Sequence, residues 1–316
     1  KHVDRKPVSV KSYANIAIVK YWGKADAERM IPSTSSISLT LENMYTETKL
    51  SFLPEDATGD VMYIDDELQG EKETIKASKV LDLFRTNPNQ HVKIETWNNM
   101  PTAAGLSSSS SGLSALVKAA NELFQVGKTQ SELAQIAKFA SGSSSRSFFG
   151  PLAAWDKDSG EVYQVETDLK LAMIMLVLTD QKKPVSSRDG MKLCTETSTS
   201  FPEWIKQSEQ DYKDMLGYLK ANDFQAVGEL TEANALRMHQ TTSTANPPFS
   251  YLTDASYQAM DKVKVLRASG EQCYFTMDAG PNVKVLCLEE DLDRLADHFR
   301  KDYDVIVSRT KELPDA

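Results

Sequence analysis

Residues 101–112 read PTAAGLSSSSSG, a run of small residues between two segments of different periodicity. Before it, HVKIETW at 91–97 alternates apolar and polar residues as a half-buried strand does. After it, apolar residues recur at helical spacing, at Leu113, Leu116, Val117, Ala120, Leu123 and Phe124. Small residues let consecutive backbone N–H groups approach an anion, and the helix that follows adds the positive end of its dipole. The run therefore predicts a phosphate-binding loop that leads from a strand into a helix.

A flexible linker or a plain helix cap is the alternative interpretation of this run. The phosphate loop is favoured because linkers join domains, whereas this run continues directly into an amphipathic helix. The run is not a Walker loop, since GxxxxGKS/T is missing, and it is not a dinucleotide-binding fingerprint.

Length and charge limit the classes of protein to consider. A chain of 316 residues is long for one hydrophobic core, so we expect two domains with a ligand site at their junction. The formal net charge of −9 argues against a nucleic acid or a membrane surface as partner, because both attract basic faces. The longest apolar stretch, at 171–178, is far shorter than the roughly 20 residues of a membrane helix, and we expect a cytoplasmic protein. The three cysteines have no metal-ligand or disulfide-framework spacing.

Periodicity predicts the order of the elements. SISLTLENMYTETKLSFL at 36–53 alternates as a half-buried strand does, and a second helix begins at a capping box from Thr129 to Glu132. LAMIMLVL at 171–178 is typical of a strand buried on both faces, which we expect to close the first domain. The polar segment at 180–190 then marks the boundary, which gives domains 1–183 and 184–316.

The C-terminal segment alternates helices with paired strands. The pattern predicts a helix ending at 268, strands at 273–277 and 283–288, a helix at 292–299 and a strand at 303–307. This order is typical of a small α+β sandwich resembling half of a ferredoxin-like fold.

Two clusters of Ser and Arg suggest a substrate with anionic groups at both ends. SGSSSRS at 141–147 combines hydroxyls with Arg146, and SSRD at 186–189 repeats the composition with Arg188. Arginine is the side chain best suited to hold a carboxylate or phosphate bidentately. A solvated loop arginine is the alternative for Arg146.

Further polar residues stand beside buried segments. YANIAIVKYWGK at 13–24 places Lys20 and Lys24 four residues apart beside aromatic rings, which an amphipathic surface element would also explain. Asp278 lies between a strand and a Gly-Pro turn, where it is either a reactive acid or a turn residue. The four histidines have no metal-ligand or triad spacing.

Taken in order, ANIAIVKYWGK, PTAAGLSSSSSG, ASGSSSRSFFG, VSSRDGM and CYFTMDAGPNVK resemble the mevalonate diphosphate decarboxylases of the GHMP kinase superfamily. The resemblance covers nearly the whole chain, and it implies an α+β fold with an N-terminal ribosomal-protein-S5-like domain and a C-terminal ferredoxin-like α/β sandwich. One departure is that Ser107 and Ser110 stand where the family often has Ala. The resemblance implies ATP and Mg²⁺ as cofactors, with metal ligands unassigned, and a homodimer.

The implied reaction phosphorylates the tertiary 3-hydroxyl of mevalonate 5-diphosphate, after which phosphate and carbon dioxide leave to give isopentenyl diphosphate. A hindered, weakly acidic alcohol gains from a carboxylate that accepts or orients its proton, and Asp278 is the candidate. The implied catalytic residues are Asn15, Lys20, Arg146 and Asp278. The implied substrate contacts are Tyr13, Lys20, Lys24, Ser141, Ser143, Arg146, Ser187 and Arg188. The implied ATP contacts are Gly105, Leu106, Ser107, Ser108, Ser109 and Ser110.

Two other functions remain open at this point. A small-molecule kinase of the same superfamily would stop at the phosphorylated product and release no carbon dioxide. A nucleotide-binding sensor without turnover is the second, but it would not need an acid such as Asp278 at its centre.

Overall fold

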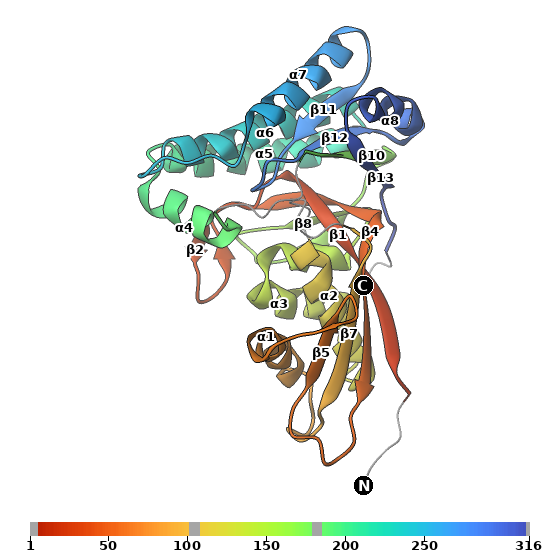
Figure 1. Cartoon of the computed structure of the whole chain (residues 1–316). Coiled ribbons are helices and arrows are strands. Elements are labelled where there is room, and N and C mark those ends of the chain that lie inside the picture. Colours follow the sequence, from red (N-terminus) through yellow and green to blue (C-terminus); the bar gives the residue numbers. More distant parts are fainter. Residues whose placement is uncertain (1–5, 101–107, 179–184, 314–316) are drawn as a thin grey trace.

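The computed structural model describes residues 6–100, 108–178 and 185–313, with the side chains of 108 and 109 excepted. These residues form two sheets, each covered by helices, and the halves that contain them lie one above the other in Figure 1. None of the described helices combines the length and apolar character that crossing a membrane requires.

The first sheet is organised around one long strand, β4 (Ser36–Phe52). On one side β4 pairs with β1 (Val8–Val19), and on the other it pairs first with β8 (Leu152–Trp155) and then with β7 (Val92–Asn98), all antiparallel. The order β6-β5-β7-β4-β8-β9 is completed by β5 (Val61–Ile64), β6 (Glu67–Leu68) and β9 (Val162–Val165). A separate short hairpin consists of β2 (Lys24–Asp26) and β3 (Ile31–Pro32).

Three helices cover this first sheet, as Figure 1 shows. They are α1 (Glu71–Asp82), α2 (Ser108–Leu123) and α3 (Gln130–Ala140). Their apolar faces join the sheet in one core that contains Leu116, Leu133 and Trp155. The predicted helix after residue 112 and the capping box between Thr129 and Glu132 are confirmed.

The first part of β4 differs from the predicted half-buried strand, because every residue from Ser36 to Leu41 is buried. The apolar side chains of Ile37, Leu39 and Leu41 belong to the core. The alternating hydroxyl face is also covered, since η2 (Gly142–Phe148), a 3-10 helix, packs against this part of the molecule. The prediction failed because a row of Ser and Thr has the same pattern whether it faces water or a buried polar group.

The second sheet has the strand order β11-β12-β10-β13. Its strands are β10 (Leu171–Val177), β11 (Cys273–Thr276), β12 (Val283–Leu288) and β13 (Asp304–Arg309). The helices of this half are α4 (Ser187–Thr197), α5 (Phe201–Lys220), α6 (Phe224–Ser243), α7 (Asp254–Ala268) and α8 (Leu292–Arg300), with the short η3 (Glu289–Asp291) before α8. The elements predicted beyond residue 254 are confirmed, with bounds that shift by up to two residues.

The predicted domain boundary after residue 183 does not follow the sheets. Strand β10 was expected to close the first domain, but it pairs antiparallel with both β12 and β13 at the centre of the second sheet. Its burial on both faces was read correctly, yet an apolar run does not say which sheet it joins. The chain therefore enters its second half at β10, before the polar segment that was taken as the boundary.

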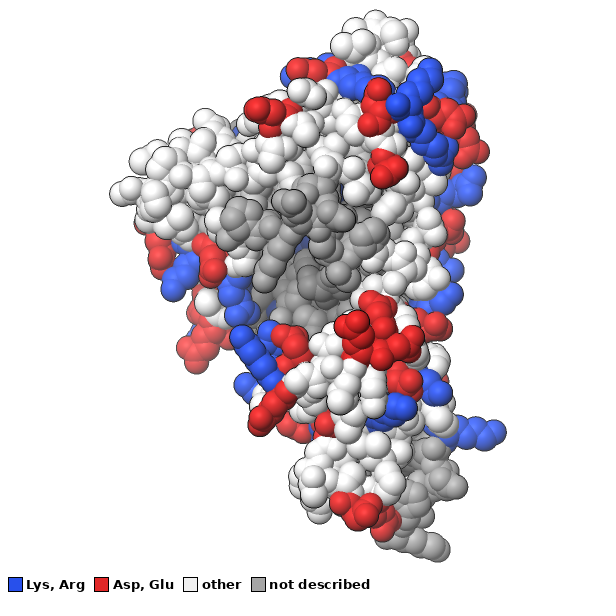
Figure 2. Space-filling view, in the orientation of Figure 1, with Lys and Arg blue, Asp and Glu red and all other residues white. Residues whose placement is uncertain are grey.

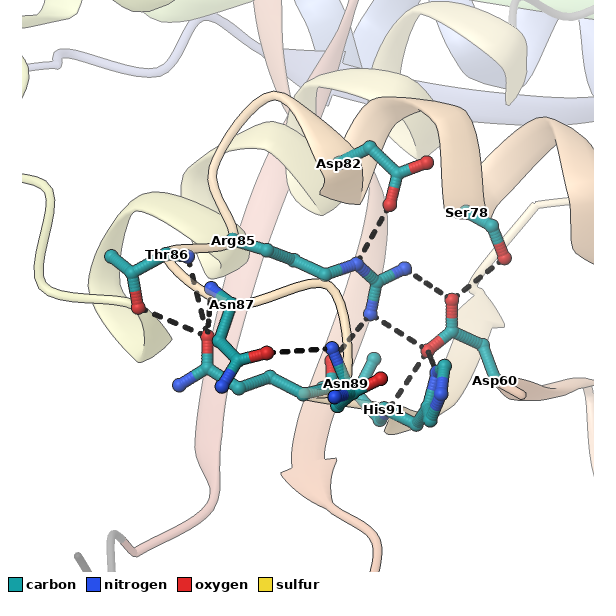
Figure 3. A network of polar contacts seen from close by, with 10 residues as sticks. Asp60, Ser78, Asp82, Arg85, Thr86, Asn87, Asn89 and His91 are labelled. Carbon is teal, nitrogen blue, oxygen red and sulfur yellow. Dashed lines mark hydrogen bonds and ion pairs between the residues drawn. The ribbon is translucent and has the colours of Figure 1, made fainter. Parts of the chain in front are cut away.

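A buried ion pair fixes α1 to the first sheet (Figure 3). Arg85, just after α1, binds the carboxylate of Asp60, whose side chain is only 2% exposed. Asp60 also accepts hydrogen bonds from the Ser78 hydroxyl at 2.7 Å and from the Val92 backbone N–H at 2.9 Å. Burial alone would raise the pKa of Asp60, but these hydrogen bonds outweigh it and hold the pKa below its ordinary value.

Charged side chains are mixed over the described surface. On the face shown in Figure 2, blue Lys and Arg side chains alternate with red Asp and Glu side chains around the edge, and several carboxylates gather on the lower half.

Candidate active site

The site is built around the end of β1, which runs between the two halves of the molecule. Lys20 follows β1 directly, and its backbone N–H donates a hydrogen bond of 2.8 Å to the Asn234 side chain on α6. Thr34 donates its hydroxyl hydrogen to the Lys20 carbonyl at 2.9 Å. The Trp22 carbonyl accepts a hydrogen bond of 2.9 Å from the indole of Trp204 on α5. Contacts from both halves thus fix the position of the Lys20 backbone.

Close packing continues at Gly23, whose φ of +118° lies in the region that favours glycine. A Cβ at this position would lie 2.5 Å from the Phe201 ring on α5. The backbone after Lys20 can therefore approach α5 only because residue 23 has no side chain.

Asp278, at the turn after β11, lies between two lysine side chains. Lys20 Nζ donates to Asp278 Oδ1 at 2.8 Å, and Lys284 Nζ on β12 lies 3.4 Å from Oδ2. The Asp278 side chain is 29% exposed, whereas those of Lys20 and Lys284 are 3% and 0% exposed. The Asp278 carboxylate is thus the accessible group of the three, and the two ammonium groups beside it are buried.

The two lysines control the ionisation of Asp278. Burial would raise the pKa of Asp278, but the charges of Lys20 and Lys284 outweigh burial and hold it far below its usual range. Burial lowers the pKa of Lys20, and the nearby charge of Asp278 offsets part of that effect. Asp278 is therefore a carboxylate over the whole range in which enzymes work, and it is a weak base.

Arg146, in η2, is a buried guanidinium held by hydroxyls and one amide. Its Nε donates to Ser38 Oγ at 3.1 Å and to Asn15 Oδ1 at 3.3 Å, and Nη1 donates to Ser36 Oγ at 2.6 Å. Since Arg has five N–H groups, these contacts use two and leave three without a partner among the described residues. Burial lowers the pKa of Arg146 to about 10, and the negative charge of Asp278 opposes this effect. A buried cation, whose donors the described residues use only in part, therefore lies near the Asp278 carboxylate.

Asn15, on β1, links the Arg146 guanidinium to the backbone and hydroxyls of η2 through hydrogen bonds. Its Nδ2 donates to Ser147 Oγ at 2.7 Å and to the Ser143 carbonyl at 3.0 Å. Because its Oδ1 accepts from Arg146, the Asn15 amide aligns the guanidinium with the rest of η2.

A second cationic group surrounds Tyr21. Burial raises the pKa of Tyr21 to about 12, and the charges of Arg146 and Arg188 oppose this rise. Burial lowers the pKa of Lys24, and the charge of Arg188 adds to this effect. Arg188 lies in the first turn of α4, and it is exposed. Tyr21, Lys24, Arg146 and Arg188 thus lie near one another, although they come from separate segments of the chain.

The predicted serines take up different positions. Ser141 and Ser143 are half-buried and lie 3.2 Å apart between their hydroxyl oxygens, beside the Arg146 segment. Ser187 begins α4 next to Arg188. Ser110 is buried in the first turn of α2. Among the predicted ATP contacts, residues 105, 106 and 107 and the side chains of 108 and 109 lie outside the described residues.

The described contacts of Tyr13 are with residues outside this cluster, and its predicted role as a substrate contact stays a prediction. Its ring packs against Tyr45 at 6.1 Å and lies under Lys311 Nζ at 5.4 Å, and it lines a hollow with Ser308. Regular alternation would place Tyr13 and Asn15 on the same face of β1, but the register shift between them interrupts it.

Sequence reasoning missed several residues of the site. Lys284 was quoted within a motif without being assigned a role, although a lysine in the apolar run VKVLCL is unusual for a buried strand. Ser36 and Ser38 were read as a solvent face, and Tyr21 was passed over in favour of Tyr13.

The oxygen donors fit a magnesium ion carried by a nucleotide. The described residues contain no group of three or more His, Cys, Asp or Glu side chains that could hold a metal ion. Mg²⁺ usually keeps several waters and binds through one or two carboxylates together with substrate phosphates. The half-exposed Asp278 carboxylate is a donor of this kind, so the site suits a metal that arrives with ATP phosphates.

Comparison with known families accounts for almost the whole chain. Residues 12–165 match the diphosphomevalonate decarboxylase-like N-terminal domain, and residues 173–313 match the mevalonate 5-diphosphate decarboxylase C-terminal domain. The chain belongs to the diphosphomevalonate decarboxylase family. The interval between the two matched regions, 166–172, runs from the end of β9 to the start of β10, where the sheets also divide.

Individual relatives agree with this assignment. A mevalonate pyrophosphate decarboxylase structure from Streptococcus pyogenes is 66% identical, covers 100% of both chains and superposes with a TM-score of 0.96. The protein MDDEF, solved with MVAPP, AMPPCP and magnesium, is 40% identical over 97% of this chain and 98% of its own, with a TM-score of 0.89. The diphosphomevalonate decarboxylase of Candida albicans is 31% identical over 91% of this chain and 86% of its own length. The family resemblance and the α+β fold predicted from the sequence are confirmed.

Proposed function

We propose that this protein catalyses the ATP- and Mg²⁺-dependent decarboxylation of mevalonate 5-diphosphate. ATP phosphorylates the 3-hydroxyl, and loss of that phosphate and of carbon dioxide then gives isopentenyl diphosphate and ADP. The observation that carries this proposal is the buried Arg146, which lies near the ionised Asp278 and has three N–H groups that no other described residue accepts from. A decarboxylase of a hydroxy acid needs a carboxylate holder beside a group that orients the hydroxyl, and these two residues have those properties.

Arg146 holds the carboxylate that is lost. A guanidinium can bind a carboxylate through two parallel hydrogen bonds, which fixes its plane relative to C3. Departure of the phosphate builds positive charge at C3, and the electrons of the C1–C2 bond then form the double bond. Anchoring by Ser36 and Ser38 keeps the guanidinium in place while the carboxylate leaves as neutral carbon dioxide.

Asp278 orients the 3-hydroxyl for attack on the γ-phosphate of ATP. Because Lys20 and Lys284 hold its pKa far below the ordinary value, Asp278 is too weak a base to remove the proton before attack. It accepts the hydroxyl hydrogen bond and takes the proton late, when the oxygen has largely bonded to phosphorus. The loose transition state of phosphoryl transfer requires little early deprotonation.

The cationic group around Tyr21 holds the diphosphate of the substrate. Lys24 and Arg188 supply positive charge, and the hydroxyls of Tyr21, Ser187 and Ser141 supply hydrogen-bond donors, with Ser143 beside them. Ser110 and the residues before it hold the ATP phosphates, since the start of α2 directs backbone N–H groups and the positive end of the helix dipole toward them.

Product identity tests this proposal. Phosphorus-31 NMR of the protein incubated with ATP, Mg²⁺ and mevalonate 5-diphosphate should show isopentenyl diphosphate, ADP and phosphate. Mevalonate and mevalonate 5-phosphate serve as control substrates. Phosphorylation of either control at a similar rate would favour a kinase of the same superfamily and overturn the proposal.

We further propose that the protein is a cytoplasmic homodimer, on the strength of its family resemblance. Sedimentation equilibrium should give a mass near twice that of the chain, and a mass equal to one chain would contradict the dimer. Recovery of the activity in a membrane or secreted fraction would contradict the cytoplasmic assignment.

A further inference from the structure

Lys118, on α2, is held by a hydroxyl and a backbone carbonyl and not by a carboxylate among the described residues. Its Nζ donates hydrogen bonds to Ser12 Oγ at 2.9 Å and to the Ser147 carbonyl at 3.0 Å, and it lies 5.0 Å from the centre of the Phe148 ring. It forms no ion pair with a carboxylate in the part of the chain that the structure describes. Burial therefore lowers its pKa to about 7. Lys118 is half-buried, and even partial burial of an ammonium group without a counter-charge costs stability. Such residues are expected where function requires them.

One hydrogen bond of Lys118 leads to the start of α2. The Ser12 oxygen accepts from the Lys118 ammonium. Because Ser114 donates its only hydroxyl hydrogen to a backbone carbonyl, the Ser12 hydroxyl donates to Ser114 Oγ, 2.6 Å away. Ser114 in turn donates to the Ser110 carbonyl at 2.6 Å. The ammonium at one end can only donate and the carbonyl at the other can only accept, so all three bonds run in one direction. The chain of bonds ends in the first turn of α2, where the ATP phosphates are proposed to lie.

The other hydrogen bond leads to the carboxylate-binding side of the site. Ser147, whose carbonyl accepts from Lys118, also accepts from Asn15 Nδ2 through its hydroxyl at 2.7 Å. Asn15 Oδ1 accepts from Arg146 Nε at 3.3 Å. A shift of the Lys118 ammonium therefore changes the support of the guanidinium that is proposed to hold the substrate carboxylate.

We propose that Lys118 is a positioning residue that couples the two halves of the site, so that nucleotide and mevalonate 5-diphosphate strengthen each other's binding. This inference rests on the proposed function. Lys118 touches neither ligand and acts through Ser12 toward α2 and through Ser147 toward Arg146. Coupling of this kind is reciprocal, so each ligand raises the affinity of the other by the same factor.

The coupling factor measures directly how much one ligand strengthens the binding of the other. It is the ratio of the Kd of Mg²⁺–AMPPCP for the free protein to its Kd for the protein saturated with mevalonate 5-diphosphate, obtained by isothermal titration calorimetry. Allosteric couplings commonly lie between about 5- and 150-fold. In Lys118→Met the factor should fall by roughly fivefold or more toward 1, and Lys118→Arg should keep most of it, because Arg retains the charge and the donors.

Two further variants separate coupling from stability. Ser12→Ala removes only the hydrogen bonds that lead from Lys118 toward α2, so it should lower the coupling factor. The Kd of mevalonate 5-diphosphate alone should stay within about twofold of the wild-type value. Lys72→Met removes an exposed lysine on α1 and should leave the factor unchanged. Thermal unfolding of each variant shows that the titrations are made on folded protein, and Ser12→Ala supplies the test if Lys118→Met does not fold.

A wild-type coupling factor of 1, or an unchanged factor in both Lys118→Met and Ser12→Ala, would overturn the inference and leave Lys118 a packing residue. Failure of mevalonate 5-diphosphate to bind the wild-type protein at all would instead contradict the proposed function, and the coupling would fall with it.

Discussion

Replacing Arg146 by Gln removes the guanidinium proposed to hold the substrate carboxylate. Arg146 has three N–H groups free for the substrate among the described contacts, and two of them suffice for a bidentate pair. A hydrogen bond to a charged group is worth about 1.5–3 kcal/mol, so two such bonds contribute about 3–6 kcal/mol. At 1.36 kcal/mol for each factor of ten, kcat/KM for mevalonate 5-diphosphate should fall by roughly 10²- to 10⁴-fold.

The Kd of Mg²⁺–AMPPCP in the absence of substrate should change much less, by no more than about threefold, since the hydrogen bonds of Arg146 among the described residues go to Asn15, Ser36 and Ser38 and not to α2. Arg146→Lys is the matched control: it keeps the charge but loses the planar fork, and its kcat/KM should lie between those of the wild type and Arg146→Gln. Steady-state kinetics with a coupled ADP assay gives these values. A kcat/KM within threefold of wild type in Arg146→Gln would refute the assignment of the guanidinium to the carboxylate.

Three more predictions concern catalysis and stability. Asp278→Asn should lower kcat roughly a hundredfold or more with the Kd of mevalonate 5-diphosphate largely kept, as stopped-flow turnover and calorimetry would show, and near-normal turnover would make Asp278 a turn residue. Asp60→Asn should lower the free energy of unfolding by about 3–5 kcal/mol at pH 7. Because the folded pKa of Asp60 lies below the unfolded one, the wild type should lose this advantage as pH falls below the ordinary carboxyl range and through the folded pKa, and urea unfolding at several pH values should show the two proteins converge. Gly23→Ala should lower the free energy of unfolding by about 1–3 kcal/mol, because the new Cβ meets the Phe201 ring and the backbone conformation at residue 23 does not suit a side chain. Gly59→Ala, with no atom within 4 Å of its Cβ, should leave the free energy of unfolding unchanged when both variants are unfolded with urea.

Local patterns predicted the elements of this protein well. The helix after the Ser-rich run, the capping box at Thr129 and the alternating elements beyond residue 254 all follow from periodicity and capping, which depend only on neighbours in the sequence. The partner of a strand depends on residues far along the chain, and for that reason β10 was assigned to the wrong half.

The candidate site was predicted in part for the same reason. Arg146 and Asp278 stand in conspicuous motifs, and the structure brings both, with Lys20, to one cluster. Their roles toward ligands remain predictions. Lys118 and Lys284 were overlooked because a single lysine in an apolar pattern looks like a surface residue. The fold buries Lys284 fully and Lys118 in part.

The most direct test of the proposed activity follows both products of one turnover. The protein is incubated with ATP, Mg²⁺ and mevalonate 5-diphosphate labelled at the C1 carboxylate, and ADP and labelled carbon dioxide are measured together. Equal amounts of the two are predicted, because the cluster that phosphorylates the hydroxyl also holds the carboxylate that leaves. ADP without labelled carbon dioxide, or no ADP at all, would contradict the account.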